Sequence, residues 1–249
     1  MTKEKALDLL FKENTEDLKK NQSYKDNFKE YELPSKYFLL EMYNRQKQLQ
    51  MFLADRGKTS KFPNQVKDLR QEDVQLAIYH LFCMQIEFNE LKIELHKLFE
   101  DKEADTIDAR YELIDMFFFM FNVGIYTGLD ILAVVDYIDT LCVAVDPPEK
   151  QITNVTDIDN AIYELMNYLD KLPWKAWKEY DYFTFDFYNP QIIMSYGNAI
   201  KYMLTFAKEV FKETEQSLFN LYMNKWEENK RRQMDLSSGY ILNERDKSS

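Results

Sequence analysis

Two pairs of carboxylates stand at helical spacing in the segment 71–128, where most of the other residues are apolar. The first pair is Glu87 and Glu90, and the second pair is Glu112 and Asp115. In an α-helix, residues three positions apart lie about 60° apart around the axis, so the members of each pair share one face. If the two segments form neighbouring helices, all four carboxylates can converge on one place between them.

The apolar surroundings of these acids indicate a metal site. Ionised carboxylates are rarely buried without a partner, and four that converge repel one another unless cations lie between them. Oxygen ligands favour Mg²⁺, with Mn²⁺ as the other possibility, over zinc. The chain has two histidines, and His96 lies half a turn around its predicted helix from Glu87, so a zinc site with histidine ligands is not expected.

Carboxylate-bound Mg²⁺ commonly contacts substrate phosphates. The expected chemistry is therefore metal-assisted attack of water on a phosphate ester or anhydride. The alternative is that each acid only lies on the solvated stripe of an amphipathic helix.

A late helical segment supplies a complementary basic face. Tyr222, Lys225, Asn229 and Arg232 recur at spacings of three, four and three residues, which places them on one side of a helix. Lysine offers a point charge to phosphate oxygens, and arginine offers a planar fork. The alternative is an ordinary solvated face near a helix C-terminus, where cations are favoured in any case.

The composition favours an all-α protein with an acidic surface. The 249 residues include only five glycines and six prolines, and the formal net charge is −11. This charge argues against a general nucleic-acid surface, and the chain contains no glycine-rich phosphate loop. The two cysteines, Cys83 and Cys142, are expected to be buried thiols, which suits a reducing compartment.

The N-terminus is charged throughout and does not resemble a signal peptide. The apolar stretch 116–135 is interrupted by Asn122, two glycines and Asp130, so we expect a helix buried in protein and no membrane span.

Apolar periodicity and helix breakers predict a single all-α domain over residues 1–249, a bundle of mostly antiparallel helices with the metal site between two core helices. Asp68 is the expected cap of the first carboxylate helix, and Asn189-Pro190 is the expected start of the last long helical region. Residues 1–34 are predicted to be peripheral and 243–249 to be a mobile tail, while the aromatic segment 173–189 receives no assignment. The expected helices cover 37–54, 68–100, 106 to Gly124 or Gly128, 130–145, 157–172 and 190–233, the last with a break near Thr214.

The ordered motifs ExxE, ExxD and a late YxxK…N…RQ resemble the dimeric all-α dUTPases of the MazG-like nucleotide pyrophosphohydrolase superfamily. In that family the late segment typically reads YxxKNxxNxxRQ, followed by a Gly-Tyr pair. Here it reads YMNKWEENKRRQ, with Gly239-Tyr240 further on, and Trp226 replaces the usual asparagine. The resemblance covers roughly residues 37–240 and implies the all-α nucleoside triphosphate pyrophosphatase type of bundle.

This resemblance implies roles for particular residues. Glu87, Glu90, Glu112 and Asp115 would bind Mg²⁺, and Glu87 would also orient or deprotonate the attacking water. Lys225, Asn229 and Arg232 would hold the phosphates. The nucleoside would contact three further side chains, namely Gln46, Gln50 and Tyr222.

The implied activity is Mg²⁺-dependent hydrolysis of dUTP, and of dUDP, to dUMP by a cytoplasmic homodimer, in the host cytoplasm if a phage encodes the chain. No membrane or nucleic acid is expected as a partner, and no feature identifies a regulatory protein. Two alternatives remain open. One is a related pyrophosphohydrolase for another nucleotide such as dCTP, and the other is a non-catalytic helical interaction protein on the same fold.

Overall fold

The computed structural model describes residues 28–33, 37–57, 59, 61–63, 69–100, 106–144, 155–172 and 183–234. Seven α-helices and no strands make up the secondary structure of this described part, which confirms the predicted all-α class. Several sequence predictions lie outside the described residues. These are the N-terminal segment up to residue 27, the Asp68 cap, the aromatic segment 173–182 and the tail from residue 235.

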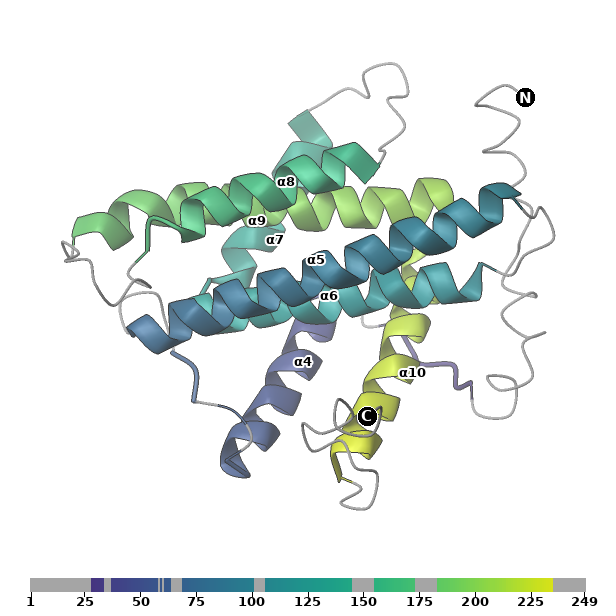
Figure 1. Cartoon of the computed structure of the whole chain (residues 1–249), viewed down its shortest axis with the longest axis horizontal. Helices are drawn as coiled ribbons and strands as arrows, with labels where there is room; N and C mark the ends of the chain where they lie inside the picture. The colour runs from purple at the N-terminus through teal and green to yellow at the C-terminus, as the bar shows by residue number, and fades with distance from the viewer. Residues whose placement is uncertain are drawn as a thin grey trace, which may run out of the picture.

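The helices α5 (Gln71–Glu100) and α6 (Ile107–Thr127) form the central pair and pack against each other along their length. Figure 1 shows α8 (Val155–Leu169) and α9 (Phe183–Val210) on one side of this pair, with α4 (Phe38–Asp55) and α10 (Glu215–Met234) on the other. The helix α7 (Ile131–Ala144) packs against α4 and α9. None of the described helices combines the length and apolar character needed to cross a membrane.

Helix α6 is the most enclosed element, because apolar side chains occupy almost all of its surface. Four of its positions escape burial, and they recur at intervals of four, three and four residues: Asp108, Glu112, Asp115 and Phe119. This spacing defines one stripe of the helix. Glu112 and Asp115 therefore occupy the only accessible face of α6.

Glycine and capping side chains set several of the helix ends. Gly128 ends α6 in the left-handed conformation, with φ 65°, and the next residue, Leu129, donates its N–H to the carbonyl of Gly124. Thr214 and Ser217 exchange hydrogen bonds at the start of α10. The gap between α9 and α10 confirms the predicted break near Thr214. The predicted helix start at Asn189-Pro190 is wrong, because α9 begins at Phe183 and runs through Pro190. A proline removes one backbone hydrogen bond, and the remaining turns of this long helix continue past it.

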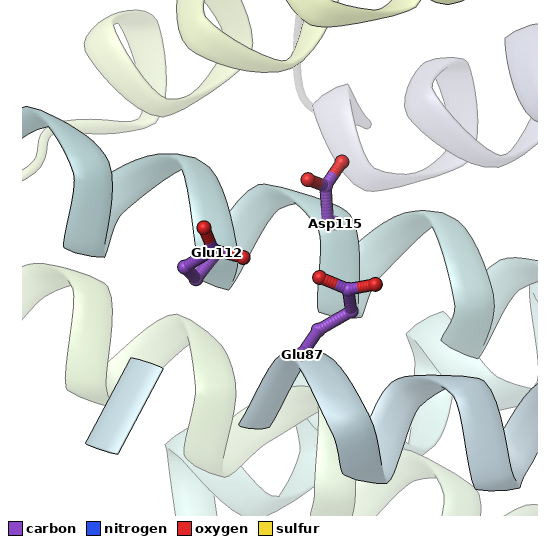
Figure 2. A group of neighbouring side chains, drawn as sticks. All are labelled: Glu87, Glu112 and Asp115. Carbon is purple, nitrogen blue, oxygen red and sulfur yellow. The ribbon is translucent and has the colours of Figure 1, made fainter. Parts of the chain in front are cut away.

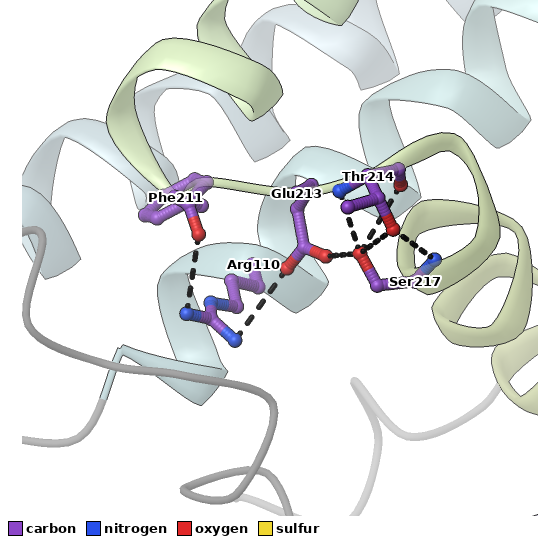
Figure 3. Close-up of polar contacts among 5 residues, drawn as sticks. All are labelled: Arg110, Phe211, Glu213, Thr214 and Ser217. Carbon is purple, nitrogen blue, oxygen red and sulfur yellow. Dashed lines mark hydrogen bonds and ion pairs between the residues drawn. The ribbon is translucent and has the colours of Figure 1, made fainter.

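A buried ion pair fixes the start of α10 against the first turn of α6. Arg110 and Glu213 are both buried, and Arg110 Nη1 lies 3.5 Å from Glu213 Oε1 (Figure 3). Arg110 also donates to the carbonyl of Phe211 over 3.4 Å, and the Ser217 hydroxyl donates to the other oxygen of Glu213. Burial is the main cause that raises the pKa of Glu213, while Arg110 opposes this increase. Since Lys225 and Arg232 lie on α10, this contact helps to position the basic face.

Candidate metal centre

Three carboxylates from the central helix pair meet at one place. One oxygen each of Glu87, Glu112 and Asp115 lies within 4.8 Å of the others, and all three side chains are half-buried. Figure 2 shows Glu87 reaching from α5 toward the two acids of α6. The antiparallel packing of α5 and α6 brings these residues together, since Glu87 lies near the middle of α5 and the two acids lie in the first half of α6.

The carboxylates raise one another's proton affinity. Burial is the largest cause that raises the pKa of Glu87 to about 8, and the charge of Asp115 is the next. A hydrogen bond from the protonated Glu87 to Glu112 contributes in the same direction. Burial also raises the pKa of Glu112 and of Asp115. Such a cluster is costly to ionise fully unless a cation neutralises it.

Helix α10 brings one cation directly to this cluster. Lys225 Nζ lies 2.9 Å from Asp115 Oδ2, and the two side chains are 15% and 20% exposed. The ammonium also lies over the ring of Tyr111, 5.0 Å from its centroid. Its charge lowers the pKa of both Asp115 and Glu112, although burial outweighs this effect. The structure therefore places Lys225, which the sequence predicted to bind phosphate, beside the acidic cluster.

The other two predicted phosphate ligands lie further from the carboxylates. Arg232 is close enough for its charge to lower the pKa of Asp115, and it pairs with Glu228 on the same helix. Asn229 is half-buried on α10, and no described contact joins it to the three acids. Glu228 was not expected at the site, although its own charge raises the pKa of Asp115.

Glu90 does not join the group, which corrects the prediction that four acids converge. Its side chain is exposed and is not among the three gathered carboxylates, because the rotation of α5 against α6 turns this position toward solvent. Its charge still raises the pKa of Glu87 and Glu112, so it lies close to the cluster without being one of the three gathered ligands.

Tyr222 also departs from its predicted role as a nucleoside contact. The side chain is 0% exposed and packs on Phe118 and Phe121. Its hydroxyl donates to the carbonyl of Met42 over 2.8 Å, which ties α10 to α4. The neighbouring Trp226 does the same by donating from Nε1 to the carbonyl of Arg45. Both aromatic residues hold the basic helix in place, and Tyr222 leaves no surface for a ligand.

The two predicted base contacts, Gln46 and Gln50, lie in a buried polar network two helical turns from the acids. Gln46 Nε2 donates to Asn122 Oδ1 over 2.9 Å, and Gln50 Oε1 accepts from the Tyr126 hydroxyl over 3.2 Å. Asn122 lies seven residues after Asp115 on α6, and its other neighbour, His80, lies seven residues before Glu87 on α5. Seven residues of helix span about 10 Å. The acidic cluster and the Asn122–His80 contact therefore lie about 10 Å apart along the interface between α5 and α6.

Sequence reasoning gave His80, Asn122 and Tyr126 no role. The available signal was Asn122, a polar residue in the apolar second half of α6, because buried amides require hydrogen-bonding partners.

The three-carboxylate group fits a divalent cation. Two ligands on opposite sides of one Mg²⁺ ion are about 4 Å apart, which is close to the 4.8 Å limit of the group. All three offer hard oxygen atoms, and their half-buried position leaves the group partly exposed to solvent.

Comparisons with known proteins found no match to a family model, to a curated protein or to a solved structure.

Proposed function

We propose that this chain is a Mg²⁺-dependent pyrophosphohydrolase of the all-α type that converts dUTP, and also dUDP, to dUMP. The observation that carries the proposal is the convergence of three half-buried carboxylates with the Lys225 ammonium beside them. A phosphoanhydride substrate would use both the carboxylates and the ammonium. Its oxygens bind to cations, which are a carboxylate-held metal ion and Lys225, and its hydrolysis requires an activated water.

Glu87, Glu112 and Asp115 would hold the metal, which supplies charge neutralisation for the phosphate oxygens. Glu87 would accept a proton from the attacking water as a general base. Lys225 would bind the phosphate chain, with Arg232 further along the same face. The water oxygen bonds to phosphorus, the anhydride bond breaks, and dUTP yields dUMP and pyrophosphate.

The position of the amide network supports a nucleotide as the substrate. Gln46 and Asn122 lie about 10 Å along the helices from the acids, on the side where α4 crosses α6. Paired amide donors and acceptors can recognise the edge of a base. A nucleoside triphosphate carries its phosphates and base at opposite ends and would connect the two places.

The first test measures pyrophosphate and phosphate release from a panel of deoxynucleotides with Mg²⁺ and with EDTA. We expect metal-dependent release from dUTP, and loss of turnover in Glu87→Gln with the fold retained. Glu100→Gln is the matched control, because Glu100 is exposed at the far end of α5.

Preference for another nucleotide such as dCTP would retain the metal centre and reject the uracil assignment. Full activity in Glu87→Gln would reject the catalytic role of that carboxylate. Absence of hydrolysis with every nucleotide would favour a non-catalytic helical interaction protein. The cytoplasmic homodimer that the resemblance implies remains part of the same proposal.

A further inference from the structure

Hydrogen bonds to α6 orient the amides of the two glutamines of α4. Gln46 and Gln50 lie one turn apart on the same face of the helix, and they are 3% and 6% exposed. An amide presents a hydrogen-bond acceptor at its oxygen and donors at its nitrogen. If a protein group binds the amide nitrogen, the oxygen remains as an acceptor for a ligand. If a protein group binds the oxygen, the nitrogen remains as a donor.

The orientation of Gln46 is set through Asn122. Gln46 Nε2 donates to Asn122 Oδ1, so Asn122 directs its own Nδ2 toward His80 Nδ1, 3.4 Å away. An amide nitrogen only donates, so this orientation of Asn122 requires His80 Nδ1 to be the bare, accepting nitrogen, with the ring proton on Nε2. Burial lowers the pKa of His80 to about 4, so the ring is neutral at physiological pH.

The opposite arrangement would reverse every hydrogen bond in this chain. If His80 carried its proton on Nδ1, Asn122 would have to turn Oδ1 toward it. The Asn122 nitrogen would then face Gln46, and Gln46 would present its own nitrogen to a ligand. The tautomer of one histidine thus determines the polarity of an amide on a different helix.

The end of Gln46 that remains is an acceptor. Gln46 Oε1 is buried and has no hydrogen-bond partner among the described protein atoms. A buried acceptor without a partner is costly, so this oxygen calls for a donor other than the described protein atoms, which a ligand can supply.

Gln50 has the opposite polarity. Its Oε1 accepts from the Tyr126 hydroxyl, which is itself hydrogen-bonded to Thr59 Oγ1, and this leaves Nε2 as the donor.

We propose that His80 is a positioning residue for base selectivity, which acts through Asn122 to present the Gln46 oxygen as an acceptor beside the Gln50 donor. This pair complements an imide edge, an N–H next to a carbonyl, as found in uracil. It opposes cytosine, whose ring nitrogen accepts at the same place and whose amino group donates. The inference rests on the proposed function for the presence of a nucleotide, and it assigns the selecting device to residues outside the metal centre.

The ligand-free test is a long-range ¹H–¹⁵N NMR spectrum of the imidazole rings at neutral pH. Only two histidines contribute, and the exposed His96 serves as the internal comparison. We expect a bare Nδ1 and a protonated Nε2 in His80. A proton on His80 Nδ1 would overturn the proposal whatever the protein binds.

The ligand test compares the affinities of dUMP and dCMP by calorimetry. We expect wild-type protein to prefer dUMP, and His80→Phe to reduce that preference roughly tenfold, because Asn122 and Gln46 can then turn over. A phenyl ring preserves the stacking on Tyr126, which lies 5.3 Å from His80 between centroids. His96→Phe is the control and should leave the ratio unchanged.

Two variants of Asn122 keep the test decisive if His80→Phe fails to fold. Asn122→Leu removes both hydrogen bonds and should lower the dUMP preference to a similar extent. Asn122→Asp still accepts from Gln46 Nε2 and should retain the preference. An unchanged ratio in a folded His80→Phe or Asn122→Leu protein would overturn the positioning role.

The outcomes separate this inference from the proposed function. Selective binding of dUMP together with a proton on His80 Nδ1 would reject the positioning role of His80 and leave the proposed function standing. The expected tautomer with binding of neither nucleotide would reject the proposed function and, with it, the base-selecting role.

Discussion

Lys225 lies beside the acidic cluster and is the residue proposed to bind the substrate phosphates. Its ammonium lies 2.9 Å from Asp115 and lowers the pKa of Asp115 and Glu112. We expect Lys225→Met to raise both pKa values and to increase the KM for dUTP by roughly 10- to 100-fold, the range expected for a lost charged hydrogen bond. Steady-state kinetics and NMR titration of the carboxyl carbons would measure the two effects.

Arg231→Met provides the comparison for Lys225, because Arg231 is exposed on the same helix. An unchanged KM together with unchanged carboxyl titration in Lys225→Met would remove this lysine from the site.

For single residues, the sequence indicated which side chains belong to the candidate site better than it indicated the directions in which those side chains point. The spacing of Glu112 and Asp115 was enough to place both on one stripe, and Glu87 followed from the opposing helix. The exposure of Glu90 and the complete burial of Tyr222 depend on how the helices are rotated against their neighbours, which spacing within one helix does not determine.

Among the elements, the start of α10 depends on the buried pair of Arg110 and Glu213. Removing one member of a buried ion pair leaves an uncompensated charge, which typically costs about 3–5 kcal/mol. We expect Arg110→Met to lower the free energy of unfolding by about this amount, as measured by urea denaturation. The double variant Arg110→Met/Glu213→Gln should recover part of the loss, because it leaves no buried charge behind.

The same double-mutant cycle has a second readout at the metal centre. If the ion pair positions α10, Arg110→Met should also weaken dUTP binding under conditions where the protein remains folded. A stability loss in the double variant equal to the sum of the losses in the two single variants would show that Arg110 and Glu213 act independently.

Element boundaries were predictable where local chemistry determines them. Gly128 ends α6 because a left-handed residue closes the helix, and Thr214 starts α10 because its hydroxyl caps the first turn. The start of α9 was not predictable in this way. Proline is favoured in a first turn, yet Pro190 lies inside α9, so a local preference alone misplaced the boundary.

For the whole molecule, the all-α class follows from composition and apolar periodicity, which are properties of the entire chain. The buried network of Gln46, Asn122 and His80 joins three helices that are far apart in sequence. Pairing of that kind is a tertiary property, so the sequence pattern indicated candidate amides without revealing their partners.

The acidic cluster also makes the stability of the whole metal-free protein depend on pH. The pKa of Glu87 rises from an ordinary value of 4.5 to about 8 in the folded state, with burial as the main cause. Between these pH values the folded protein retains a proton that the unfolded chain has released. Stability therefore decreases as pH rises from about 4.5 to 8, and the contribution is fully present only below this window.

We expect the Tm measured in EDTA to fall across this pH range, and Mg²⁺ to raise it most at the alkaline end, where the carboxylates are ionised and protons no longer compete for them. Other buried acids, such as Glu213, contribute a slope of the same sign, so the comparison must be made with a variant. Glu87→Gln should have a flatter Tm profile than wild type and a smaller shift with Mg²⁺. Identical profiles for the two proteins, with and without Mg²⁺, would show that Glu87 neither holds the extra proton nor binds the metal.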